Sequence, residues 1–291
     1  APGDVAQIMA GENQSPAYIE AVRARFGLDQ PILIQFWLYL SSVLHGDLGN
    51  SFTYAQPVVA VLWQRAPATF LLVGTSLLVA SVAGTIVGTV LSRRVGSTLD
   101  TLTSLVAVGS YSLPVFWLGI VLVLVFGVSL RWFPTAGMVS PQAPAEGIGR
   151  ALDVASHLVL PVITLSAVYF GQYVRLARSS VRDVLREDYI TAARAAGFPE
   201  RTILMRYALR NALLPIVTLL GLQMGLVLAG AVLTETVFSW PGLGTLVYQA
   251  ILGRDVPLVI GAYVAVSLGV LIAALVTDVV YALLDPRVEY R

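Results

Sequence analysis

Long apolar runs with at most one charged residue each alternate with short polar segments along most of this chain. Some of the runs are long enough for a helix that crosses a lipid bilayer, which takes about 20 apolar residues. These runs cover approximately residues 68–92, 101–127, 157–177, 211–234 and 257–284. Pro114 lies inside the second run and is expected to kink or break its helix. The pattern predicts an all-α membrane protein, a polytopic helical bundle with five spans in this chain.

Residues 1–67 contain no run of that length. The apolar run from Ile32 to Leu44 is only as long as a segment that lies in the membrane interface. It carries Trp37 and Tyr39, whose side chains favour the level of the lipid headgroups. We therefore expect an amphipathic, interfacial region over 1–67 and a transmembrane domain over 68–291.

The composition supports a membrane protein, with 57% hydrophobic residues, 12% charged residues and a mean hydropathy of +0.79. All 18 basic residues are arginine. The phosphate-binding loop of an ATPase needs a lysine, so ATP-derived energy would have to come from a partner. The chain has no cysteine, and His45 and His157 are isolated. We therefore expect no metal or cofactor site, and an intramembrane enzyme is disfavoured.

The arginines are distributed unevenly over the segments between the runs. The segments 93–100, 174–211 and 285–291 hold 12 of the 18 arginines, and the segments 1–67, 128–156 and 235–256, which are longer in total, hold the other 6. Short loops rich in arginine stay in the cytoplasm. We therefore expect the arginine-rich segments and the C-terminus to be cytoplasmic, and 1–67 and 235–256 to be external.

One polar, arginine-rich segment lies between two of the uncharged runs, from Glu187 to Pro215. The residues from 183 to 196 are good helix formers, and Gly197 is expected to end that helix because glycine accepts the left-handed conformation. Pro199 suits the first turn of a second short helix over about 200–209. The pattern predicts two short helices bent about Gly197, an elbow over about 183–210.

The elbow could bind anionic lipid or another protein. Its arginines alternate with acidic residues, whereas lipid-binding patches are usually of one sign. Ala192 and Ala193 expose little apolar area to lipid, but they allow the backbone of another protein to approach closely. The elbow therefore favours docking to a soluble protein.

The sequence Thr191-Ala192-Ala193-x-x-x-Gly197 resembles the cytoplasmic EAA loop of bacterial ABC importer permeases. Thr191 stands where the general pattern has glutamate, and the ending over 208–215 departs from the usual isoleucine-x-leucine-proline toward the form seen in the dipeptide and oligopeptide branch. In that family the loop is the coupling helix that sits in a groove of the ATPase subunit. The coupling residues that the resemblance implies are Glu187, Asp188, Tyr189, Ala192, Ala193, Arg194, Gly197, Arg201, Leu204 and Arg210.

A second characteristic stretch, from Glu235 to Gly244, lies in an external segment. Pro-Gly forces a turn there, flanked by aromatic residues. The residues alone leave open whether this is a tight turn with an aromatic side chain at the membrane interface or a functional gate. The stretch resembles the peptide permeases, and the external gate or binding-protein contact that this implies comprises Glu235, Phe238, Trp240, Pro241 and Gly242.

Polar residues inside the spans are candidates for the transport pathway. The candidates are Tyr111, Tyr169, Gln172 and Gln223, although a tyrosine within a span more often packs or lies at the interface. Asp278 is the only acid clearly inside an apolar run, and structural pairing is favoured over a proton relay for it.

Two Gly-x-x-x-Gly motifs occur within the uncharged runs, Gly84 to Gly88 and Gly221 to Gly225. Small residues at this spacing allow the backbones of two helices to approach closely. We expect both motifs to serve helix packing.

The resemblance covers nearly the whole chain and implies the type I ABC importer permease fold, with one further span upstream of Ala1. It implies a subunit that carries dipeptides or oligopeptides, or a small cargo such as haem or a nickel complex, across the inner (plasma) membrane of a bacterium. The implied partners are a homologous permease subunit in a heterodimer, two ABC ATPase subunits that bind ATP and Mg²⁺, and an external substrate-binding protein.

The alternative function is that of a secondary transporter that works alone. That class usually has internal repeats, and ion or proton sites in broken helices near mid-membrane. This chain has no pair of mid-membrane acids, and the polar elbow would have no role in such a protein.

Overall fold

The computed structural model describes residues 15–17, 19–20, 23, 27, 29–93, 96–99, 101–103, 105, 109, 113–144 and 146–284. These residues are helical or irregular, apart from one isolated β-bridge between Asn50 and Pro57. The chain divides into two compact units. Unit 1 comprises Ala1–Pro67 with Leu246–Val266, and unit 2 comprises Ala68–Thr245 with Ser267–Arg291.

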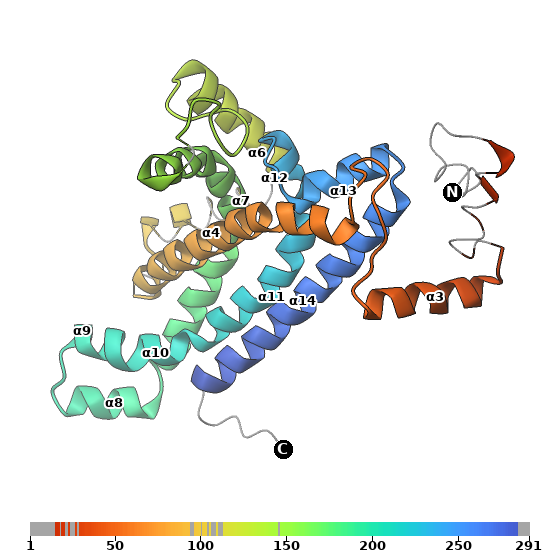
Figure 1. Cartoon of the computed structure of the whole chain (residues 1–291). Helices are drawn as coiled ribbons and strands as arrows, with labels where there is room; N and C mark the ends of the chain where they lie inside the picture. Colours follow the sequence, from red (N-terminus) through yellow and green to blue (C-terminus); the bar gives the residue numbers. More distant parts are fainter. Residues whose placement is uncertain are drawn as a thin grey trace. The chain divides into compact units, whose positions relative to one another are not determined.

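Unit 1 contains α3 (Ile32–Leu44), the first turns of α4 (Val58–Ser92), the last turns of α13 (Leu243–Leu252) and the first part of α14 (Val256–Leu284) (Figure 1). No residue of α3 is buried, and its apolar side chains are strongly exposed: 81% for Ile32 and 65% for Trp37. The helix therefore buries little apolar surface against the residues that the structure describes.

A buried carboxylate in unit 1 ties the loop before α4 to the start of α14. Asp255 is fully buried, and its Oδ1 accepts a hydrogen bond of 3.2 Å from the N–H of Leu258 in the first turn of α14. Its Oδ2 accepts hydrogen bonds from Ser51 Oγ at 2.6 Å and from the N–H of Thr53 at 3.0 Å. A single aspartate thus caps a helix and fixes the loop.

Unit 2 contains the rest of α4 and most of the remaining helices. In chain order these are α6 (Val115–Leu122), the π-helix η1 (Val123–Ser129), α7 (Gly147–Val184), α8 (Asp188–Ala195), α9 (Glu200–Thr202), the π-helix η2 (Ile203–Ala208), α10 (Leu209–Ala212), α11 (Leu214–Gly230) and α12 (Val232–Val237). The first turn of α13 and the second part of α14 complete it.

The core of unit 2 forms where α4 packs against α7 and the turn after α12. The buried residues of this cluster are Ala68, Leu72, Val73, Leu77, Val162, Leu165, Ala231 and Trp240. The two glycine motifs act as predicted. A Cβ added at Gly84 would lie 2.5 Å from the Cβ of Tyr173 in α7, and one at Gly225 would lie 2.9 Å from the side chain of Val270 in α14. Only glycine permits these approaches.

The described residues include three helices that are long and apolar enough to span a membrane: α4, α7 and the part of α14 from Val256 to Thr277. A fourth span is counted if Glu200–Ala212 and Leu214–Gly225, which are bent by 41°, are taken together. Pro114 breaks the predicted run 101–127, because α6 begins directly after it, and much of the part before it lies outside the described residues. The predicted total of five spans therefore stays a prediction.

Candidate coupling site

The elbow begins with a break that the sequence pattern did not indicate. The predicted helix over 183–196 is wrong at its start, because α7 ends at Val184 and α8 begins at Asp188. Between them the chain turns, and Glu187 has an extended backbone with φ −66° and ψ 149°. The break reorients the chain so that the apolar side of α8 packs against the second arm of the elbow.

The predicted end of α8 at Gly197 is confirmed. Gly197 has φ +81°, in the left-handed region. Its N–H donates to the carbonyl oxygen of Arg194 at 3.0 Å, and the N–H of Phe198 donates to that of Ala193 at 3.2 Å. These paired bonds form a Schellman motif, which satisfies carbonyl groups left open at the end of the helix. The chain is thereby reversed into the second arm.

The second arm runs from Glu200 to Ala212 as α9, η2 and α10, so it continues past the predicted end at about 209. Ile190 of α8 and Ile203 and Ala208 of the second arm are fully buried, together with the mostly buried Ala193. Figure 1 shows α8 lying alongside this arm. The elbow therefore has a small apolar core of its own, and Ala193 packs inside it, whereas Ala192 faces outward.

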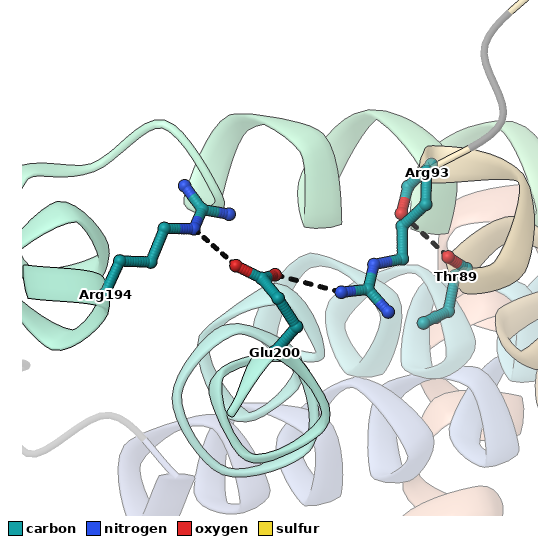
Figure 2. Close-up of polar contacts among 5 residues, drawn as sticks. Thr89, Arg93, Arg194 and Glu200 are labelled. Atoms are coloured by element: carbon teal, nitrogen blue, oxygen red, sulfur yellow. Dashed lines mark hydrogen bonds and ion pairs between the residues drawn. The ribbon is translucent and has the colours of Figure 1, made fainter. Parts of the chain in front are cut away.

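Glu200 joins the elbow to the end of α4. Its Oε1 accepts a hydrogen bond of 2.7 Å from Arg194 Nε, and its Oε2 accepts one of 2.9 Å from Arg93 Nη2 (Figure 2). The hydrogen bond from Arg194, supported by the one from Arg93, lowers the pKa of the Glu200 carboxyl group below its ordinary value. We call these three residues the Glu200 clip. Sequence reasoning missed it, because Arg93 and Glu200 are 107 positions apart.

The remaining predicted coupling residues lie mainly on the surface of the elbow. The hydroxyl oxygen of Tyr189 accepts a hydrogen bond of 2.8 Å from Asn211 Nδ2, which ties α8 to α10. Leu204 is half-buried against the elbow core. The exposed members of the predicted set are Glu187, Asp188, Tyr189, Ala192, Arg194, Gly197, Arg201 and Arg210.

The predicted gate residues of the turn after α12 are largely buried in unit 2. Trp240 is fully buried and donates a hydrogen bond of 2.8 Å from Nε1 to the carbonyl oxygen of Ala68 in α4. Phe238 and Gly242 are buried and Pro241 is half-buried, whereas Ser239 is exposed. In this conformation of the turn, Pro241 is therefore the predicted gate residue that an external protein could contact.

Glu235 organises this turn from inside. It is fully buried, and its Oε1 accepts a hydrogen bond of 2.6 Å from Thr69 Oγ1, while Oε2 accepts one of 2.9 Å from the N–H of Thr245. Burial raises the pKa of Glu235, and the hydrogen bonds oppose that rise. A Cβ on Gly244 would lie 2.7 Å from the Cα of Val232, so the turn needs glycine there. The carboxyl group thus holds the turn against α4.

The predicted pathway residues lie in different environments. Gln223 Nε2 donates a hydrogen bond of 2.7 Å to Gln172 Oε1, which joins α11 to α7, and Gln223 is buried. Tyr169 is half-buried and packs between the clusters of the α4–α7 interface. Tyr111 and the side chain of Asp278 lie outside what the structure describes. The glutamine pair therefore satisfies one donor and one acceptor between the two helices.

The chain matches the family described as binding-protein-dependent transport system inner membrane component over residues 80–290, and the N-terminal part of that membrane component over residues 1–73. The chain belongs to this family. Family members are the non-catalytic membrane subunits of ABC importers, so the chain is a permease subunit, a multi-pass protein of the inner membrane. Such a permease works with ATPase subunits and a substrate-binding protein, which sets aside a transporter that works alone.

Three curated relatives of this permease cover almost its full length. The chain is 39% identical to the probable D,D-dipeptide transport system permease protein DdpB of Escherichia coli K12, over 99% of this chain and 89% of the relative. It is 36% identical to the di/tripeptide transport system permease protein DppB of Pseudomonas aeruginosa, over 100% and 91%. It is 38% identical to the glutathione transport system permease protein GsiC of E. coli K12, over 100% and 90%.

A solved structure of the MetNI methionine ABC transporter, in an inward-facing conformation, shares the fold. The TM-score is 0.61, at 17% identity over 78% of this chain and 97% of that one. The all-helical ABC importer permease fold is thereby shown.

Proposed function

We propose that this permease translocates short peptides, the dipeptides or oligopeptides expected from the sequence. The support is that the three relatives, at 36–39% identity, are named for dipeptide, di/tripeptide and glutathione transport. We further propose that it forms a heterodimer with a homologous permease subunit, and that ATP and Mg²⁺ are bound by the ATPase partners.

The cargo is tested by reconstituting the permease with its partners in proteoliposomes. Labelled dipeptide should enter in an ATP-dependent manner, and unlabelled di- and tripeptides should compete with it. Competition by haem or a nickel complex, with none from short peptides, would overturn the assignment.

The elbow is proposed to be the element that docks into the ATPase subunit. The observation that carries this is its construction: a reversed pair of helices with its own apolar core, which presents the small residue Ala192 outward. A docking element must keep its shape without the membrane around it, and the buried Ile190 and Ile203 supply that rigidity. The Glu200 clip then links the docked elbow to α4.

The docking proposal is tested by Ala192→Trp, which places a bulky side chain on the outer surface without disturbing the elbow core. Ala193→Trp is a poor probe, because Ala193 is part of that core. The control is Ala151→Trp, an equally exposed position near the start of α7. Ala192→Trp should lose ATPase attachment and ATP-driven uptake, and the control should keep both. Normal ATPase retention in Ala192→Trp would refute docking through this surface.

We propose the membrane topology from the contacts that Glu235 and Glu200 make. Thr69 in the first half of α4 holds the Glu235 turn, and Arg93 just after the end of α4 holds the elbow. These residues are 24 positions apart, or about 36 Å along a helix at about 1.5 Å per residue, which exceeds the hydrocarbon thickness of about 30 Å. The turn and the elbow therefore belong on opposite sides of the membrane.

The arginine distribution puts the elbow in the cytoplasm and the turn, with 1–67, outside. The test uses cysteines introduced at the exposed Asn50 and Ser239 of this cysteine-free chain. Both should react with a membrane-impermeant thiol reagent added to intact spheroplasts. Reaction of either site only after lysis would contradict the proposed arrangement.

A further inference from the structure

The last third of α7 and the turn that follows it carry a concentrated positive surface. A hollow of about 390 Å³ lies along it. The residues that line the hollow, here called the arginine face, are Arg175, Arg178, Ser179, Arg182, Asp183 and Arg186. Four guanidinium groups and one carboxylate give this face a formal charge of +3, whereas the whole chain has +1.

The spacing explains why these side chains share one surface. Arg175, Arg178 and Arg182 are separated by three and four positions, the spacing of neighbours on one side of an α-helix, and Arg186 follows in the turn after α7. Arg175, Arg182 and Arg186 form no ion pair with any residue that the structure describes. The charges of these three arginines are therefore not paired with the described carboxylates of the elbow.

The arginine face begins where the apolar part of α7 ends. Arg175 is the first charged residue after the uncharged run 157–174, so it marks the edge of the hydrocarbon layer. Side chains of a helix lean toward its N-terminus, here toward the membrane. The headgroup layer is about 5–8 Å thick on each side, and Arg182 is about 10 Å beyond Arg175 along the helix axis. Leaning guanidinium groups of Arg175, Arg178 and Arg182 thus reach the level of lipid phosphates.

We propose that the arginine face is a binding site for a phosphate group, supplied by the headgroup of an anionic phospholipid of the inner leaflet. Guanidinium groups bind phosphate through paired, charge-assisted hydrogen bonds. The lipid would lie beside the helix that leads directly into the elbow, and would hold α7 at a fixed depth in the membrane. This inference uses one part of the proposed function, namely that the elbow faces the cytoplasm.

The test uses the assembled transporter in nanodiscs of phosphatidylcholine alone, of phosphatidylcholine with phosphatidylglycerol, or of phosphatidylcholine with added inorganic phosphate. Phosphatidylglycerol retained per complex is counted by native mass spectrometry, and the thermal midpoint is measured alongside it. The variant is Arg175→Gln combined with Arg182→Gln. The control is Arg150→Gln, which removes an arginine from the opposite end of α7.

Phosphatidylglycerol should raise the midpoint of the unmodified complex and of the control. In the double variant its binding should weaken about tenfold for each charge-assisted hydrogen bond that the substitutions remove. Equal retention by the double variant and the control would overturn the site. An equal effect of inorganic phosphate would overturn the lipid as the source.

Loss of the ATPase subunits from the double variant in phosphatidylcholine alone would overturn the proposal in favour of protein docking on this face. The readout needs no transport, so a wrong cargo assignment could not produce the same result.

Discussion

The same added methyl group is predicted to have opposite effects at two glycines of α4. At Gly88, a Cβ would lie 2.5 Å from the carbonyl oxygen of Val174 and 2.7 Å from the Cβ of Ala177, both in α7. At Gly74, a Cβ would have no heavy atom within 4 Å. We therefore expect Gly88→Ala to destabilise the protein, and Gly74→Ala, the matched control in the same helix, to leave it intact.

The magnitude follows from the atoms that Gly88→Ala would meet. Non-bonded carbon atoms pack at about 3.5–4.0 Å, so α4 and α7 would have to separate by about 1 Å, because backbone atoms and a Cβ cannot rotate away. Overpacking of this kind costs about 1–3 kcal/mol. Alanine in place of glycine stabilises a helix by up to about 1 kcal/mol, but both variants share that gain. They should differ by about 1–3 kcal/mol in the free energy of unfolding.

The assay is thermal unfolding of the purified permease complex in detergent, followed by tryptophan fluorescence. At about 2–4 °C per kcal/mol for a chain of this size, Gly88→Ala should unfold roughly 2–12 °C below Gly74→Ala. Coincident midpoints would refute the close approach of α4 and α7 at this motif. A midpoint for Gly74→Ala below that of Gly88→Ala would show that loss of glycine itself, and not contact with α7, decides the stability.

Three further substitutions probe the elbow and the gate. Gly197→Val should cost about 1–2 kcal/mol of elbow stability, because φ is +81° there, and should lower uptake. Gly197→Asn should keep normal uptake, because asparagine tolerates this conformation. Equal uptake by the two variants would contradict this prediction. Glu200→Gln should reduce uptake per ATP hydrolysed while assembly persists. The pKa of Glu200 is lowered in the folded protein, so the clip is complete above the ordinary carboxyl pKa and is lost as the pH falls through the lowered value. Coupling in the unmodified protein should therefore not change near neutral pH. Trp240→Phe should lower the unfolding midpoint by leaving the carbonyl of Ala68 without its donor, at about 1–3 kcal/mol, whereas an unchanged midpoint would show that water replaces Nε1.

Local chemistry explains which parts of the elbow could be predicted from the sequence. Gly197 ends α8 because glycine accepts φ +81° without strain, and this requirement can be recognised from one position in the sequence. The break between Val184 and Asp188 has no such signal, since no glycine or proline marks it. It exists because Ile190 must reach Ile203, a tertiary contact that overrides the helix propensity of the residues between.

The predicted gate shows a second limit of sequence reasoning. Trp240 and Phe238 suit an interfacial belt and a buried core equally well, because an aromatic ring is apolar in its body and tryptophan carries a polar tip. Their burial is decided by Glu235, whose carboxyl group draws the turn onto Thr69 through a hydrogen bond of 2.6 Å. A glutamate next to an apparent membrane edge is expected to face water, so its residue type indicated the opposite placement.

Two contacts of α4 and of the residue that follows it connect the predicted gate with the elbow, a link that no single motif reveals. About three turns after the start of α4, Thr69 binds the carboxyl group of Glu235, and just beyond its end Arg93 binds Glu200. Between them, Gly84 and Gly88 hold α4 against α7, so the helix cannot bend away from its neighbour without losing that packing. In the proposed coupling, a displacement of the elbow at Glu200 would act on a helix that is held at Thr69, at these two glycines and at Arg93. At Ala68 and Thr69 that helix contacts the buried turn of Trp240, so it connects the elbow to the predicted gate.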